Sequence, residues 1–163
     1  MNAPGLDRKT MTAVRRRVEH VDTDASGVVH FSRYFSWLET ATLENLERLG
    51  IGLDGFARAD LDLVATDVSM RYHASARFLD HIRVKVDVEK VGPARFQISG
   101  KVFREISRAT TRENSRENPG DDSVLLASGR LLFGTVAIST GAPSLLPENA
   151  GTILKECAAH ADG

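Results

Sequence analysis

The side chains most suited to catalysis lie in one stretch of the sequence, residues 22–39, which reads DTDASGVVHFSRYFSWLE. This stretch places a carboxylate, Asp24, on a glycine-containing turn eight residues before Ser32, where we expect a helix to begin. If the turn folds back, Asp24 approaches the unpaired N–H groups of the helix N-terminus, which favour negative charge. Acyl transfer needs a nucleophile or base, together with donors for the charge that develops on a carbonyl oxygen. The stretch therefore predicts an acyl-transfer site.

Other interpretations of the polar side chains in this stretch stay open. Asp24 could simply hydrogen-bond its own loop backbone, although Asp22 is the better candidate for holding the turn. Glu39, about two turns along the helix, is a rival base, and we favour for it a buried, hydrogen-bonded structural or substrate-pocket carboxylate. His30 is more typical of a packed or rim residue than of a proton shuttle.

The apolar pattern predicts one long helix that carries this site. From Arg33 to Leu49 the apolar residues recur at helical spacing, and Gly50 stands where a C-terminal cap belongs. The first half of the segment is apolar on most sides, as in a helix surrounded by protein. We therefore expect this helix at the centre of the fold, with Tyr34 and Trp37 in the core or in the wall of an acyl pocket.

Alternating residues predict strands around the helix. One strand (14–21) and a short apolar piece (28–31) precede it, and residues 53–63 form a connector after it. Four antiparallel strands follow, over residues 64–73, 82–89, 96–103 and 124–138. The last is nearly continuously apolar, which predicts a central strand buried on both faces. The fold class is therefore α+β, an antiparallel sheet wrapped around one long central helix, whose open edges favour pairing with a second copy.

The chain is long enough for about one domain. We expect a flexible N-terminal arm over residues 1–12, the folded domain over 13–140 and a C-terminal tail over 141–163. Within the domain, the charged stretch 105–122 is predicted to be a flexible insertion rather than a binding arm.

Composition excludes several classes of protein. Lys and Arg total 21 and Asp and Glu total 22, which argues against a nucleic-acid binder. The single Cys157 excludes a disulfide scaffold and a thiolate-rich metal site, so no metal or cofactor is predicted. The sequence has no apolar run near the roughly 20 residues of a membrane span, and residues 1–17 lack a signal peptide's apolar run. We therefore expect a cytoplasmic protein without membrane insertion.

The stretch 22–39 resembles the motif D-x-D-x-x-G-x-V-x-x-x-x-Y-x-x-[FW]-x-[DE] of the 4-hydroxybenzoyl-CoA thioesterase-like branch of the hot-dog fold. This resemblance implies a hot-dog fold, a homo-oligomer (dimer or tetramer), and hydrolysis of an acyl-thioester of CoA or acyl carrier protein. By position, Asp24 would be the catalytic carboxylate, acting as nucleophile or general base. The Phe31 N–H would polarise the thioester carbonyl, and Gly27 would shape the loop. Many relatives carry His or Tyr where this chain has Phe31, so only a backbone role is carried over.

We further expect five residues to contribute to substrate binding, namely His30, Tyr34, Trp37, Glu39 and Arg95. Arg95 is one of several strand cations that could meet CoA phosphates. Some relatives carry paired arginines where this chain has Gly92 and Pro93, which leaves an acyl-carrier-protein substrate open.

Two other functions remain as alternatives. Asp24 and His30 stand six residues apart, loosely like the Asp/His pair of hot-dog dehydratases or hydratases, although residues 31–33 do not match the dehydratase pattern. A non-catalytic acyl-binding protein with the same fold is the other alternative.

Overall fold

The computed structural model describes residues 10–106 and 123–161. Along the chain the elements are β1 (Val14–Arg17), the short 3₁₀ helix η1 (His20–Asp22), α1 (Phe31–Arg48), α2 (Leu53–Arg58), β2 (Leu61–Tyr72), β3 (His81–Val91), β4 (Arg95–Glu105), β5 (Ser123–Ala137) and α3 (Glu148–Ala161).

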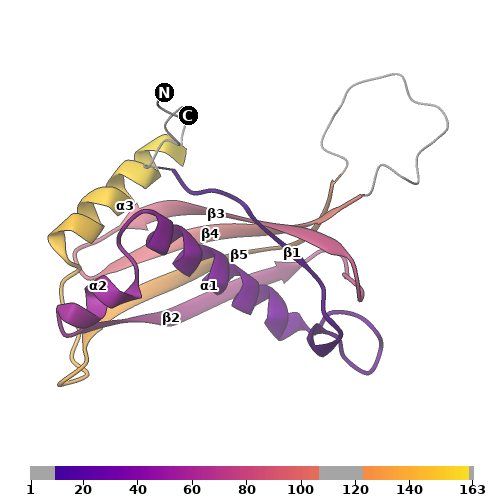
Figure 1. Cartoon of the computed structure of the whole chain (residues 1–163), viewed down its shortest axis with the longest axis horizontal. Coiled ribbons are helices and arrows are strands. Elements are labelled where there is room, and N and C mark those ends of the chain that lie inside the picture. The colour runs from indigo at the N-terminus through magenta and orange to yellow at the C-terminus, as the bar shows by residue number, and fades with distance from the viewer. Residues whose placement is uncertain (1–9, 107–122, 162–163) are drawn as a thin grey trace, which may run out of the picture.

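The strands form one antiparallel sheet in the order β1-β3-β4-β5-β2. Figure 1 shows α1 lying along one face of this sheet, with α3 packed beside β3. β1 pairs with β3 only from Val14↔Val84 to Arg17↔His81, so it covers just the first part of β3. At the other side of the sheet, β2 pairs with β5 alone. The prediction of an α+β fold with one antiparallel sheet around one long helix is confirmed.

The core lies between α1 and the sheet. Every second residue of β3, from Ile82 to Val88, is buried against the helix, as the period-two pattern predicts. Phe96 of β4 and Phe133 of β5 are fully or almost fully buried, and their rings stack with centroids 5.3 Å apart. A Cβ added at Gly100 would lie 2.4 Å from Leu38 Cδ2, so this glycine lets the helix approach the sheet closely.

The helix boundaries differ slightly from those predicted. α1 begins at Phe31, and its N-cap is His30 rather than Ser32, because the imidazole Nδ1 accepts the Ser32 N–H at 3.3 Å. Sequence rules favour serine at this position because its hydroxyl is the usual acceptor. At the other end Leu49 is the C-cap, and Gly50 follows with φ 81°, the left-handed conformation expected of a glycine after a helix.

Three further segments differ in structure from what the sequence predicts. The first strand, expected over 14–21, ends at Arg17 and is followed by η1. The expected connector over 53–63 contains α2 and the start of β2. β5 is not buried on both faces, because Arg130 is exposed and burial alternates over its second half. Its outward residues Leu132 and Gly134 are apolar but only half-buried, and so look in sequence like a buried strand.

The ends of the chain also depart from expectation. The predicted tail over 141–163 contains α3, whose buried residues Ala150, Leu154 and Cys157 are spaced for one helix face. Of the predicted arm, residues 1–9 lie outside the described residues, whereas the Thr12 N–H donates to Asn45 Oδ1 at 2.7 Å. The predicted flexible insertion also lies largely outside the described residues, which exclude 107–122.

Candidate functional site

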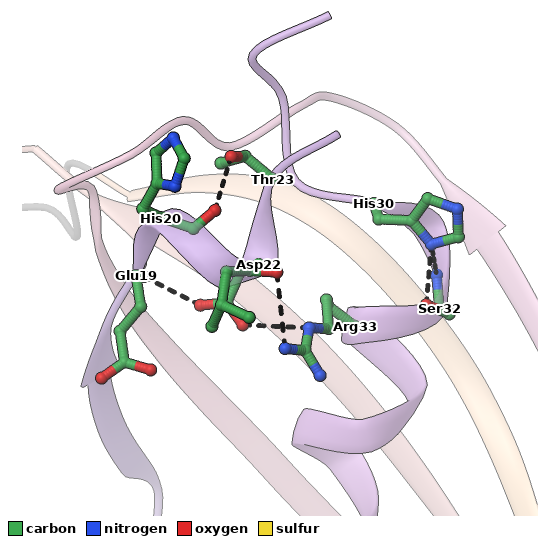
Figure 2. Close-up of polar contacts among 8 residues, drawn as sticks. Glu19, His20, Asp22, Thr23, His30, Ser32 and Arg33 are labelled. Atoms are coloured by element: carbon green, nitrogen blue, oxygen red, sulfur yellow. Dashed lines mark hydrogen bonds and ion pairs between the residues drawn. The ribbon is translucent and has the colours of Figure 1, made fainter. Parts of the chain in front are cut away.

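Asp22 anchors the loop that precedes α1. Its side chain is almost fully buried, its Oδ1 lies 3.1 Å from Arg33 Nε, and its Oδ2 accepts the Glu19 N–H at 2.8 Å. Its carbonyl oxygen accepts the His30 N–H at 2.8 Å, and Figure 2 shows the Asp22 side chain between the Glu19 backbone and the Arg33 side chain. One aspartate therefore ties η1 to both the cap and the first turn of α1, which is the holding role expected of Asp22.

Asp24 lies two residues further on and is exposed. Its Oδ1 accepts the Ser26 N–H at 2.8 Å, so one carboxylate oxygen does bond the loop backbone. The Asp24 N–H donates to the Val28 carbonyl at 2.8 Å, and Gly27 turns the loop with φ 78°. The loop thus folds back as predicted, and Asp24 Oδ2 has no hydrogen bond within the part of the chain that the structure describes.

The N-terminus of α1 is open to solvent. Phe31, its first residue, is 63% exposed, and its N–H is one of the helix donors that lack an intrahelical partner. No bond from this N–H to the described residues is present. His30 caps the helix and lies 2.7 Å from Ser32 Oγ through Nδ1, so its ring is held by the helix terminus. The end of α1 therefore offers a free backbone donor beside the Asp24 loop.

A chain of aromatic rings joins this terminus to the sheet. The rings of Phe31 and Tyr72, of Tyr72 and Tyr34, and of Tyr34 and Trp37 meet edge to face, with centroids 6.5, 5.5 and 5.3 Å apart. The Tyr72 hydroxyl donates to the Phe31 carbonyl at 3.0 Å, and the Tyr34 hydroxyl accepts the Ala76 N–H at 3.2 Å. Burial raises the pKa of both tyrosines, so both hydroxyls stay protonated at neutral pH.

Among these aromatic residues, Tyr34 and Trp37 are buried in the core, whereas Tyr72 is half-exposed at the end of β2. Sequence reasoning missed Tyr72. Its only signal is its place at the end of a strand, and nothing local indicates that the strand ends beside α1. Trp37 is covered on one side by the Arg16 guanidinium, 5.1 Å from the ring centroid.

The two remaining predicted binding residues lie away from the Asp24 loop. Glu39 lies on α1, about 12 Å along the helix axis from Phe31 at 1.5 Å per residue. It is half-buried and forms no hydrogen bond or ion pair with the described residues, so the favoured prediction of a buried, hydrogen-bonded carboxylate is wrong. Arg95 lies opposite Gly134, whereas Tyr72 lies opposite Ala127. Seven residues of β5 separate these positions, roughly 23 Å, so Arg95 lies at the other end of the sheet.

Residues 10–106 and 123–161 contain neither a metal-binding cluster nor a membrane-spanning helix. No group of three or more His, Cys, Asp or Glu residues in these ranges is placed to hold a metal ion. No helix within them is long and apolar enough to cross a membrane.

Comparison with known proteins identifies the family. The family model of the thioesterase-like superfamily matches residues 18–153. The chain therefore belongs to this superfamily, and the predicted membership of a hot-dog thioesterase family is confirmed. A curated relative from Thermosynechococcus vestitus, named 1,4-dihydroxy-2-naphthoyl-CoA hydrolase, is 29% identical over 92 residues, which is 56% of this chain and 63% of the relative.

Solved structures show the same fold. A 1,4-dihydroxy-2-naphthoyl-CoA thioesterase from Synechocystis superposes with a TM-score of 0.72 at 19% identity, covering 88% of this chain and 94% of that chain. The protein SAV2348 from Staphylococcus aureus, solved in complex with CoA, superposes with a TM-score of 0.76 at 12% identity, covering 93% and 85%. The hot-dog architecture is thereby confirmed.

Proposed function

We propose that this protein hydrolyses an acyl-thioester of CoA to a free acid and a thiol. The observation that carries the proposal is the Asp24 loop, which turns back on itself and carries an exposed carboxylate seven residues before Phe31, the first residue of α1, whose N–H has no partner among the described residues. Membership of the thioesterase-like superfamily supports it, as do the names of the relatives and the CoA bound to SAV2348.

The chemistry follows two possible routes from the same carboxylate. As a nucleophile, Asp24 attacks the thioester carbon, the C–S bond breaks, and water then hydrolyses the mixed anhydride. As a general base, Asp24 takes a proton from water while the water oxygen attacks, and the thiolate leaves and is protonated. In either route the Phe31 N–H would donate to the carbonyl oxygen as its negative charge develops. Trapping a mixed anhydride under single turnover distinguishes the two routes.

We propose an aromatic acyl group for the substrate. Two relatives are named for 1,4-dihydroxy-2-naphthoyl-CoA, an aromatic thioester. The exposed rings of Phe31 and Tyr72 stand at the helix terminus, where an aromatic acyl group could pack edge to face against them. His30, whose ring lies 4.4 Å from that of Phe31, would form part of the same rim.

The active unit is proposed to be a homo-oligomer, a dimer or a tetramer built from dimers. β2 is an edge strand, and most of its residues are exposed in the single chain. An open edge of this length is a template for strand pairing, and a second copy there would close the site beside Tyr72.

The test is a panel of thioesters offered to the purified full chain. The panel contains aromatic and short aliphatic acyl-CoAs, one acyl carrier protein thioester and one 2-enoyl-CoA, with free thiol and enoyl absorbance as readouts. We expect release of thiol from aromatic acyl-CoA. Hydration of the enoyl-CoA without thiol release would favour the Asp24/His30 hydratase instead, and binding without turnover would favour an acyl-binding protein.

A further inference from the structure

The face of the sheet turned away from α1 carries a polar hollow of about 300 Å³. Most of its lining comes from three neighbouring strands, β2, β5 and β4, and Glu89 of the next strand, β3, completes it. The residues that matter are three cations and three serines, namely Arg71, Lys101, Arg130, Ser69, Ser99 and Ser128. None of these residues belongs to the Asp24 loop or to α1.

The strand register arranges these residues in two rows across the sheet. Lys101, Ser128 and Arg71 lie directly opposite one another in one row, and Ser99, Arg130 and Ser69 do so in the next. Residues directly opposite in antiparallel strands share a face. Cations and serines therefore alternate both along each row and between the two rows. Neighbouring strands are about 4.8 Å apart, so each long cationic side chain can reach over the short serine beside it.

The charges of the hollow are poorly balanced by the protein itself. Arg130 pairs with Glu89 at 3.3 Å, and Glu89 is the one carboxylate of the lining. Neither Arg71 nor Lys101 forms an ion pair with the described residues. The hollow thus gathers three positive charges against one negative charge, and like charges held close together on a sheet destabilise it. Ser128 Oγ is already oriented, 3.0 Å from His73 Nε2.

We propose that this hollow binds a phosphate group. Guanidinium, ammonium and hydroxyl groups are the donors that phosphate oxygens accept, and the small serines leave the space such a group needs. The phosphate could be inorganic phosphate, or it could be carried by a nucleotide such as CoA. Binding of a CoA phosphate would rest on the proposed function, since CoA is the proposed substrate carrier. Binding of inorganic phosphate would not, because the hollow lies on the opposite face of the sheet from α1.

The experiment is calorimetric titration of the full chain in a phosphate-free buffer of low ionic strength. The ligands are inorganic phosphate, CoA and 3′-dephospho-CoA. We expect saturable binding of phosphate that weakens roughly tenfold in Lys101→Gln and in Arg71→Gln, the loss for one charge-assisted hydrogen bond. Lys155→Gln, which removes an exposed cation on α3, is the matched control and should bind as the wild type does.

The source of the phosphate is read from the two nucleotides. The hollow binds the 3′-phosphate of CoA if CoA binds more tightly than 3′-dephospho-CoA and if Arg71→Gln weakens CoA binding. It binds inorganic phosphate instead if CoA binding is the same in the wild type and in these variants. Absence of saturable phosphate binding overturns the proposal, and so does an equal loss in Lys155→Gln. Because the readout is heat of binding, failure here leaves the hydrolase proposal standing, and an inactive Asp24→Asn protein should still bind phosphate.

Discussion

Asp22 and Asp24 stand two residues apart, yet their surroundings suit them to different tasks. Asp22 is buried, paired with Arg33 and bonded to the backbone, so its oxygens are committed to holding the loop. Asp24 is exposed and uses one oxygen for the turn. A carboxylate that must react needs an oxygen that is free, and this requirement favours Asp24 over Asp22 as the catalytic residue.

Replacing Asp24 with Asn should remove most turnover while the protein stays folded. The change is nearly isosteric, and the amide oxygen can still accept the Ser26 N–H. We expect kcat to fall at least about 100-fold, the low end for loss of an acid–base group, and steady-state thioesterase assays measure it. Asp54→Asn, at an exposed acidic position on α2, is the control and should stay near wild type. An Asp24→Asn protein with near wild-type kcat would move the assignment to Glu39.

Replacing Asp22 with Asn should instead reduce stability. The variant loses the ion pair with Arg33 but keeps an oxygen for the Glu19 N–H. We expect the free energy of unfolding to fall by about 1–2 kcal/mol, at the lower end for a charged hydrogen bond because the Arg33 side chain is 35% exposed and can be solvated. Urea unfolding measures the change. An Asp22→Asn protein as stable as Asp24→Asn would contradict the anchoring role.

Among the elements, α1 matters most, because its N-terminus keeps one backbone donor, the Phe31 N–H, without a partner in the described residues. The His30 side chain caps the helix, the Phe31 carbonyl accepts the Tyr72 hydroxyl, and Phe31 as a residue is exposed. The dipole of an 18-residue helix adds to the positive potential at this point. An oxyanion at the start of α1 would therefore meet one free N–H donor and a favourable positive potential.

The donor can be removed without touching the side chain. An ester in place of the amide at Phe31, introduced by semisynthesis, deletes its N–H and should lower kcat by about 100- to 1000-fold, the loss seen for one oxyanion donor. Phe31→Ala keeps the N–H and should leave catalysis largely intact. His30→Asn keeps a capping side chain and serves as the control for a proton shuttle. The backbone mechanism would be refuted if the ester variant kept its full rate while His30→Asn lost most of its activity and changed its pH profile.

For the whole molecule, the open edge of β2 is the feature from which we infer its assembly. The sheet is closed at the β3 side by β1 and α3, whereas β2 has no neighbour beyond it in the described chain. Val68 and Tyr72 on this strand are more than 40% exposed although both are apolar or aromatic. Pairing of two β2 strands would bury such residues and extend the sheet.

The assembly prediction is that the smallest stable species is a dimer and that the dimer is the active form. Light scattering at micromolar concentration should give at least twice the mass of 17.8 kDa. Val68→Lys should shift the protein toward monomer and lower its activity, because a charge on an edge opposes pairing. Leu145→Lys alters a more exposed apolar residue outside the strands and should change neither the mass nor the activity. A fully active monomer would contradict the prediction.

Local patterns in the sequence were enough to predict α1, the four strands after it and the turn that carries Asp24. Helical spacing and period-two alternation depend on neighbours within a few residues, so one chain is enough to read them. The Asp24 loop was likewise predicted from spacing, and its catalytic role stays a prediction. The residues that surround this loop, in contrast, could be identified only from the folded chain. The bond from Tyr72 to Phe31, the distance of Arg95 and the pairing of Lys101, Ser128 and Arg71 all depend on strand register. Register joins residues tens of positions apart, because burial of one whole face selects it rather than any local preference.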